Sequence, residues 1–464
     1  MHEYEKVKLE KVIAMAYVFC LPLRMIDPFS FLQNYLGGLA LNFDLFFHAI
    51  GLGLWFLRGE KVKISKEKSE LFAFFLLTMG MLIFISMFNA IHYHDAFGIM
   101  YGENTFQATK GQLLYWCQYI LMAIYNLRVV YLLGMDTIWK IIDFFSDVML
   151  LVGYIQILVI VLEKHWICAL YNIIARLFYM LPSSYLLEER RIVLMEMEPA
   201  HAGYTIARLI LPLLLARLIC KGINGKNVTK MVIWLPVIYY TKSSNMYILL
   251  SVELMLFLII VCSNFFRKNK HAISRTSCMV ISFAVFVMIP LTTYCVLKGK
   301  ISEIIYYLAI KLTDKSNMST AWRTVPLYTN WEIFKQFPLL GVGNGNQGFF
   351  YWEYFPKWAY ELLKDTKTMQ AYSGQMTNGQ LFFPSVLSGV GLIGSGLLLI
   401  YFITIVWYVY RKKNKDYMCY YFFIIAAVGI IVNGFSADFV AAYDVWFVLC
   451  LPVAAFNSKV CARK

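Results

Sequence analysis

The sequence predicts an all-α integral membrane protein with about twelve transmembrane helices and one large loop outside the membrane. Its composition, its long uncharged stretches and the distribution of its basic residues support this prediction. Apolar residues make up 60% of the 464 residues and charged residues only 15%, which is far from the balance of a soluble globular chain. The chain is therefore expected to lie in a lipid bilayer.

Hydrophobic stretches long enough to cross a bilayer recur along the chain, because a helix needs about twenty apolar residues to span roughly 30 Å of hydrocarbon. The strongest stretches contain no Asp, Glu, Lys or Arg; they are residues 71–89, 276–297, 384–410 and 417–437. Weaker stretches complete the set: 12–26, 38–57, 112–134, 138–162, 202–220, 228–241, 244–264 and 439–457.

Basic residues gather in alternate turns between these stretches. If the N-terminus is cytoplasmic, most lysines and arginines fall in inner turns, whereas the short outer turns carry only Arg24, Lys110 and Lys242. An excess of basic residues in cytoplasmic turns is typical of membrane proteins. The distribution therefore predicts an even number of spans with both termini in the cytoplasm, and it gives the net charge of +14 a reason other than nucleic-acid binding.

The predicted spans divide the chain into three parts. Residues 1–297 hold helices one to nine and an outer segment, 163–201; residues 298–383 form the large extracytoplasmic loop; residues 384–464 hold the last three helices. Long loops in compact proteins usually serve a function. Chemistry is therefore expected in the two outer parts. The ten cysteines show no CxxC pair, and neither a disulfide framework nor a zinc site is predicted.

The outer segment ends in a charged stretch that leads into a span. Pro199 suits the first turn of a helix, with Glu198 as its cap. His201, Thr205 and Arg208 then follow at spacings that place them on one face of an apolar helix. An arginine inside a span is costly.

Arg208 therefore implies an interior cavity, an anionic partner or a structural ion pair, for instance with Asp143 or Asp147 of the fifth span.

The large loop contains a helical stretch that Pro338 should stop. The glycine-rich sequence that follows, Gly341 to Gly345, does not complete a nucleotide-binding motif. We interpret it as a tight turn at the membrane surface, whose backbone amides are free to contact phosphate.

Three stretches together resemble the bacterial O-antigen and capsule polymerases, within the wider O-antigen ligase and polymerase family. They are Arg191 with Glu198-Pro199-Ala-His-Ala-Gly seven residues on, Arg323 with Asn330-Trp331, Phe334 and Pro338-Leu-Leu-Gly-Val-Gly343, and Asn378-Gly-Gln-Leu with Ser388-Gly-Val-Gly-Leu-Ile-Gly394. The resemblance implies a glycosyltransferase C-type fold. It also implies an enzyme that joins oligosaccharide units carried on undecaprenyl diphosphate.

The resemblance suggests roles for these residues. Arg191 and Arg323 are the first candidates to bind the departing diphosphate, because a guanidinium engages phosphate oxygens bidentately. Supporting candidates are Arg208, Lys242 and Arg190.

Glu198, or else His201, would take the proton of the acceptor hydroxyl. The outer loops show no DxD pair or carboxylate cluster, so we expect catalysis without a metal or other cofactor. For each of these outer arginines and lysines, the alternative is that the side chain only contacts lipid headgroups.

Polymerase is favoured over ligase, because the ligases carry a histidine near the start of the late span where this chain has Asn378. A lipid-linked oligosaccharide flippase is the alternative from another class. The expected partners are the lipid-linked oligosaccharide, the bilayer and a chain-length regulator protein, with no nucleic acid. The expected location is the bacterial inner membrane, with the active site facing the periplasm or the cell exterior.

Overall fold

The computed structural model describes residues 2–23, 44–59, 65–100, 102–177, 180–196, 198–222, 225–268, 318–363, 381–435 and 443–455. The predicted span at 276–297 and the sequence Asn378 to Gln380 lie outside these residues, as do the side chains of Trp322 and Arg323.

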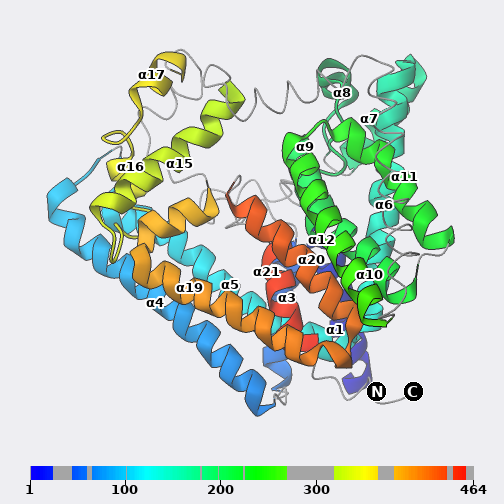
Figure 1. The fold of residues 1–464 in the computed structure, drawn as a ribbon, viewed down its shortest axis with the longest axis horizontal. Coiled ribbons are helices and arrows are strands. Elements are labelled where there is room, and N and C mark those ends of the chain that lie inside the picture. Colours follow the sequence, from blue (N-terminus) through cyan, green and yellow to red (C-terminus); the bar gives the residue numbers. More distant parts are fainter. Residues whose placement is uncertain are drawn as a thin grey trace.

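The described chain is helical almost throughout (Figure 1). Its first half contains α1 (His2–Cys20), α3 (Asp44–Arg58), α4 (Lys66–Phe97), α5 (Thr105–Leu133), α6 (Met135–Leu162), α7 (His165–Leu177), α8 (Ser183–Glu189), α9 (Pro199–Thr205), the π-helix η3 (Ile206–Ile210) and α10 (Leu211–Lys221). Its second half contains α11 (Gly225–Thr241), α12 (Ser244–Lys268), α15 (Met318–Gln336), α16 (Gln347–Tyr351), α17 (Lys357–Leu363), α19 (Phe382–Lys412), the 3-10 turn η4 (Lys413–Lys415), α20 (Tyr417–Gly434) and α21 (Tyr443–Ala455).

Several helices confirm that this is an α-helical membrane protein. Within the described ranges, six are long and apolar enough to cross a membrane: Lys66–Phe97, Thr105–Leu133, Met135–Leu162, Pro199–Lys221, Phe382–Lys415 and Tyr417–Gly434. Further helices cover other predicted spans, among them α3, α11, α12 and α21. The total of twelve and the glycosyltransferase C-type arrangement stay predictions.

The helices pack into two connected cores. One core joins α1, α4, α5, α19, α20 and α21, and the other joins α6, α7, α9, α10, α11 and α12. In Figure 1, α15, α16 and α17 stand at one end of the molecule, and α7 and α8 stand across from them at the same end. The start of α1 lies at the opposite end. The two outer segments predicted from sequence are thus on the same side of the helical body.

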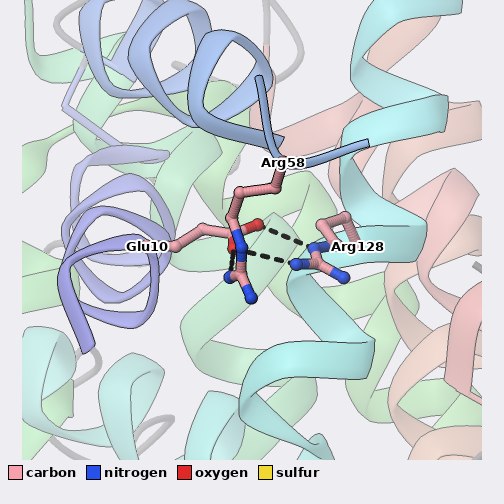
Figure 2. Close-up of polar contacts among 3 residues, drawn as sticks. All are labelled: Glu10, Arg58 and Arg128. Atoms are coloured by element: carbon pink, nitrogen blue, oxygen red, sulfur yellow. Dashed lines mark hydrogen bonds and ion pairs between the residues drawn. The ribbon is translucent and has the colours of Figure 1, made fainter. Parts of the chain in front are cut away.

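A buried ion cluster ties α1, α3 and α5 together (Figure 2). The Glu10 carboxylate accepts two hydrogen bonds from Arg128, at 2.7 and 2.8 Å, and one from Arg58 at 2.5 Å. The Arg128 guanidinium also lies 5.8 Å from the ring centre of Trp55. Removing one partner of such a buried group leaves an uncompensated charge, so this cluster fixes how the three helices meet.

The long helix α19 is broken near its start at Gly391, and a turn from another part of the chain packs into the break. Gly391 has φ 62° and ψ −164°, which breaks the helical hydrogen-bond ladder. The turn after α15 fills the gap: the Val342 and Gly343 amides donate to the Ser388 and Gly389 carbonyls at 3.0 and 2.6 Å.

In return, the Leu392 and Ile393 amides donate to the Pro338 and Leu339 carbonyls at 2.8 and 3.2 Å. The large loop is therefore joined to the membrane domain by four backbone bonds.

This joint depends on glycine. A β carbon on Gly391 would stand 2.3 Å from the Leu339 carbonyl oxygen, and one on Gly341 would stand 2.4 Å from the Ser388 carbonyl oxygen. Both glycines also have positive φ, a region that costs other residues about 1–2 kcal/mol or more.

We therefore expect Gly391→Ala to lower the melting temperature of the detergent-purified protein, or to prevent its accumulation as a monodisperse species. Gly396→Ala is the matched control in the same helix, because a β carbon there meets no atom within 4 Å. Fluorescence-detected size exclusion and thermal unfolding measure both effects. Equal stability of the two variants would show that the break does not depend on Gly391.

Candidate functional site

The outer segment places its two adjacent arginines at the ends of two different helices. Arg190 has φ 53° and ends α8. Its guanidinium donates to the Ile160 carbonyl near the end of α6 at 3.0 Å and pairs with Glu163. Cations at a helix C-terminus interact favourably with its free carbonyls. Arg190 therefore has a structural explanation here.

Arg191 binds the end of α11. Its Nε donates to the Thr241 carbonyl at 3.1 Å and its Nη2 to the Lys242 carbonyl at 3.3 Å. These contacts use two of the five guanidinium N–H groups of an arginine, and the side chain is only partly buried. Lys242 itself is exposed and has φ 46°. The structure thus brings Arg191 and Lys242 together, and it leaves Arg191 with donors for an anion.

Glu198 follows this arginine by seven residues in the same loop. It is the residue before α9, and Pro199 is the first helical residue, as the sequence predicts. The Glu198 side chain is exposed and makes no capping bond. Burial raises the pKa of Tyr185 in α8; Glu189 and Glu198 raise it further, and Arg191 opposes them. Arg191 and Glu198 therefore both act electrostatically on Tyr185.

A second carboxylate, Glu196, is buried beneath the surface of the segment. It accepts a hydrogen bond from the Thr205 hydroxyl at 2.8 Å. His201 is half-buried in the first turn of α9, with its ring 6.1 Å from that of Tyr204. Glu196 therefore joins the loop to the helix that carries His201.

Arg208 is fully buried in the π-helix η3. It donates to Asn433 of α20 and lies 3.3 Å from a carboxylate oxygen of Asp444 in α21. The predicted ion pair is thus present, but its acid is Asp444. The two acids considered from sequence pair elsewhere: Asp143 and Asp147 both bind Lys230. Arg208 pairs with Asp444 and not with an acid of the fifth predicted span, because α21 packs against η3.

Arg323 belongs to α15. This helix stands at the same end of the molecule as α8 and α9, on the other side (Figure 1). The helix ends at Gln336, just before Pro338, as predicted. Asn330 is buried and structural: its amide donates to the Pro326 carbonyl at 2.7 Å and accepts the Ser388 hydroxyl at 2.6 Å. The neighbouring Trp331 is half exposed.

The glycine turn does not offer its amides to phosphate, contrary to the interpretation from sequence. Besides the two amides bound to α19, the Asn344 amide donates to Ser86 at 3.2 Å, the Gly345 amide to Gln347 at 2.8 Å, and the Asn346 amide to the Gly343 carbonyl at 3.0 Å. The turn is buried between α4, α5 and α19. Its glycines serve close backbone packing.

Three polar residues of this region were missed by sequence reasoning. Gln156 of α6, Asp444 of α21 and Glu253 of α12 are all fully buried. Neither carboxyl oxygen of Glu253 has a hydrogen-bond partner in the described chain, and a β carbon on Gly429 would stand 2.5 Å from one of them. A lone polar residue within an apolar span is the only signal that the sequence offered for any of the three.

These features define a polytopic helical membrane protein in which Arg191, Lys242 and Glu198 lie around the junction of α8, α9 and α11. Residues 231–368 match the family model described as O-antigen ligase, and this match supports membership of the O-antigen ligase and polymerase family. A comparison with curated proteins finds no match. The matched residues include the end of α11 and all of α15. Arg191 lies before them, yet it binds two carbonyls within them.

The pair Arg208–Asp444 provides a test of the buried arrangement. We expect Asp444→Ala to destabilise the protein by about 3–5 kcal/mol, because it leaves the Arg208 charge uncompensated inside the helix bundle. The double variant Arg208→Met with Asp444→Leu should recover much of this loss. Thermal unfolding in detergent measures both, and an Asp444→Ala protein as stable as the wild type would contradict the pairing.

Proposed function

We propose that the protein is a polymerase that joins oligosaccharide repeat units carried on undecaprenyl diphosphate into O-antigen or capsular polysaccharide. The observation that carries this proposal is the attachment of the Arg191–Glu198 segment to the family-matched region through Thr241 and Lys242. The segment that carries this cation and this carboxylate is thereby bound to residues that match a family model described as O-antigen ligase.

The reaction in this proposal is a glycosyl transfer. An acceptor hydroxyl attacks the anomeric carbon of the donor sugar, the bond to the lipid diphosphate breaks, and the hydroxyl proton leaves to a base. Negative charge grows on the diphosphate, so a fixed guanidinium lowers the barrier. Arg191 suits this role because two helix-end carbonyls hold its guanidinium in place. Preorganised donors stabilise charge without a reorganisation cost.

The remaining roles follow the same logic. Arg323 is proposed to reach the diphosphate from α15, and Glu198 to accept the proton, with His201 as the alternative base. Lys242 adds positive charge beside Arg191, whereas Arg190 and Arg208 are better explained as structural residues. The proposed location is the bacterial inner membrane, with α8 and α15 on its outer side and both termini in the cytoplasm.

An O-antigen ligase is the second candidate, because the family model that matches residues 231–368 is described as O-antigen ligase. The purified protein, incubated with undecaprenyl-diphosphate repeat units, separates the candidates. Products lengthened by whole units support the polymerase. Transfer of preformed chains onto a lipid A core without lengthening would instead support the ligase, and lipid movement without new glycosidic bonds would support a flippase.

We expect Arg191→Ala and Arg323→Ala each to reduce polymer formation by about 100-fold or more, since removal of one preorganised donor costs this much in comparable sites. Arg191→Lys should fail as well, because an ammonium cannot engage two oxygens as a planar fork. Arg176→Ala is the control, since Arg176 is an exposed arginine of the same outer segment. Polymer is measured by gel analysis at matched protein levels, and wild-type chain length in the Arg191 or Arg323 variants would refute their roles.

A further inference from the structure

The backbone of the loop that carries Arg191 and Glu196 is hydrogen-bonded to a buried side chain of α6, Gln156. The Gln156 amide oxygen accepts hydrogen bonds from the Val193 amide at 3.1 Å and the Leu194 amide at 2.8 Å. Its amide nitrogen donates to the Leu194 carbonyl at 2.8 Å and to the Tyr171 hydroxyl oxygen at 3.0 Å. The amide has two donor hydrogens and two acceptor lone pairs, so these four contacts use its whole capacity.

The backbone held in this way is unusual. Leu194 has φ 56°, in the left-handed region, although it is a leucine and is fully buried. Such a conformation costs about 1–3 kcal/mol and persists only where the surroundings impose it. Gly153, one turn earlier on α6, leaves room for the side chain: a β carbon there would stand 3.0 Å from the Leu194 Cδ2 atom.

The same contacts reach the neighbouring helices. The Tyr171 hydroxyl of α7 donates to the Leu181 carbonyl at 2.8 Å, just before α8. The Ile192 amide donates to the Tyr240 carbonyl of α11 at 3.0 Å. Gln156 therefore stands where α6, α7, α8 and α11 converge on the loop.

The residues that Gln156 binds are close in the chain to the candidate site residues. Arg191 is two residues before Val193, and Glu196 and Glu198 are two and four residues after Leu194. If the turn at Leu194 relaxed to an ordinary conformation, the chain on either side would point elsewhere. The Arg191 guanidinium and the Glu198 carboxylate would then lose their mutual placement.

We propose that Gln156 is a positioning residue of the reaction site: it imposes the left-handed turn at Leu194 and thereby sets Arg191 and Glu198 in their working geometry. This inference rests on the proposed glycosyl transfer for its functional part, whereas its structural part stands on the hydrogen bonds alone. Gln156 acts through the loop and need not touch the substrate.

The test compares Gln156→Leu with Gln118→Leu in the full-length protein. Leucine is close to glutamine in size but makes none of the four bonds. Gln118 is the matched control, since it is a buried glutamine of α5 whose amide binds His48 and no residue of the loop. Gly153→Ala is a second variant: its methyl group would press on the Leu194 side chain of the loop and on Val237 of α11, and it leaves Gln156 in place.

Two measurements are made on each variant, at matched amounts of monodisperse protein. Hydrogen–deuterium exchange reports the Val193 and Leu194 amides, and steady-state kinetics with the lipid-linked repeat unit report kcat and KM. For Gln156→Leu we expect rapid exchange in the peptide covering 191–196 and a fall in kcat/KM of about 100-fold, the size expected of small misplacements of reacting groups. Gly153→Ala should shift both quantities in the same direction, and Gln118→Leu should shift neither.

The outcomes separate this inference from the proposed function. Unchanged exchange at 191–196 in Gln156→Leu would show that Gln156 does not hold the loop. Rapid exchange with unchanged kcat/KM would show that Gln156 does not position the reaction site. If Gln156→Leu does not fold, the same two criteria apply to Gln156→Met, whose unbranched side chain also makes none of the four bonds. If the wild-type protein elongates no lipid-linked units at all, the proposed function fails, while the exchange data still decide whether Gln156 holds the loop.

Discussion

The need to satisfy every backbone N–H and C=O group away from water shapes this structure at its most irregular point. Where α19 breaks at Gly391, four peptide groups would lack partners, and a buried group without a partner costs several kcal/mol in an apolar region. The turn from Pro338 to Gly343 supplies all four partners. The turn after α15 is consequently attached to α19 by backbone bonds, and α15 is held in a defined place by this attachment and by Asn330.

Charge inside the bundle follows a similar rule. The buried guanidinium groups of Arg128 and Arg208 each have a carboxylate beside them, Glu10 and Asp444 respectively. Removing charges from water is costly unless they are paired with good geometry, and each pair also connects helices that are far apart in sequence. Arg191 differs from both, because its partners are backbone carbonyls and it remains partly accessible. This difference distinguishes a candidate ligand-binding arginine from the structural ones.

The outer segment is organised by contacts with membrane helices more than by its own short helices. The loop before α9 donates hydrogen bonds to Gln156 of α6 and to the Tyr240 carbonyl of α11. Its arginine in turn binds the end of α11. A site built in this way inherits the rigidity of the bundle, which suits groups that must meet a developing charge without rearranging.

The sequence by itself determined the membrane class, the positions of the strongest spans, the start of α9 at Pro199 and the end of α15 before Pro338. These features depend on composition and on local backbone rules, which act within a few residues. The sequence also indicated the family, because a motif of consecutive residues can be recognised without the tertiary structure. Only the tertiary structure decided that Arg208 pairs with Asp444, that the glycine turn is buried, and that Gln156 seats the loop. Those pairings join residues tens to hundreds of positions apart, and a choice among many possible partners is made only when the helices pack.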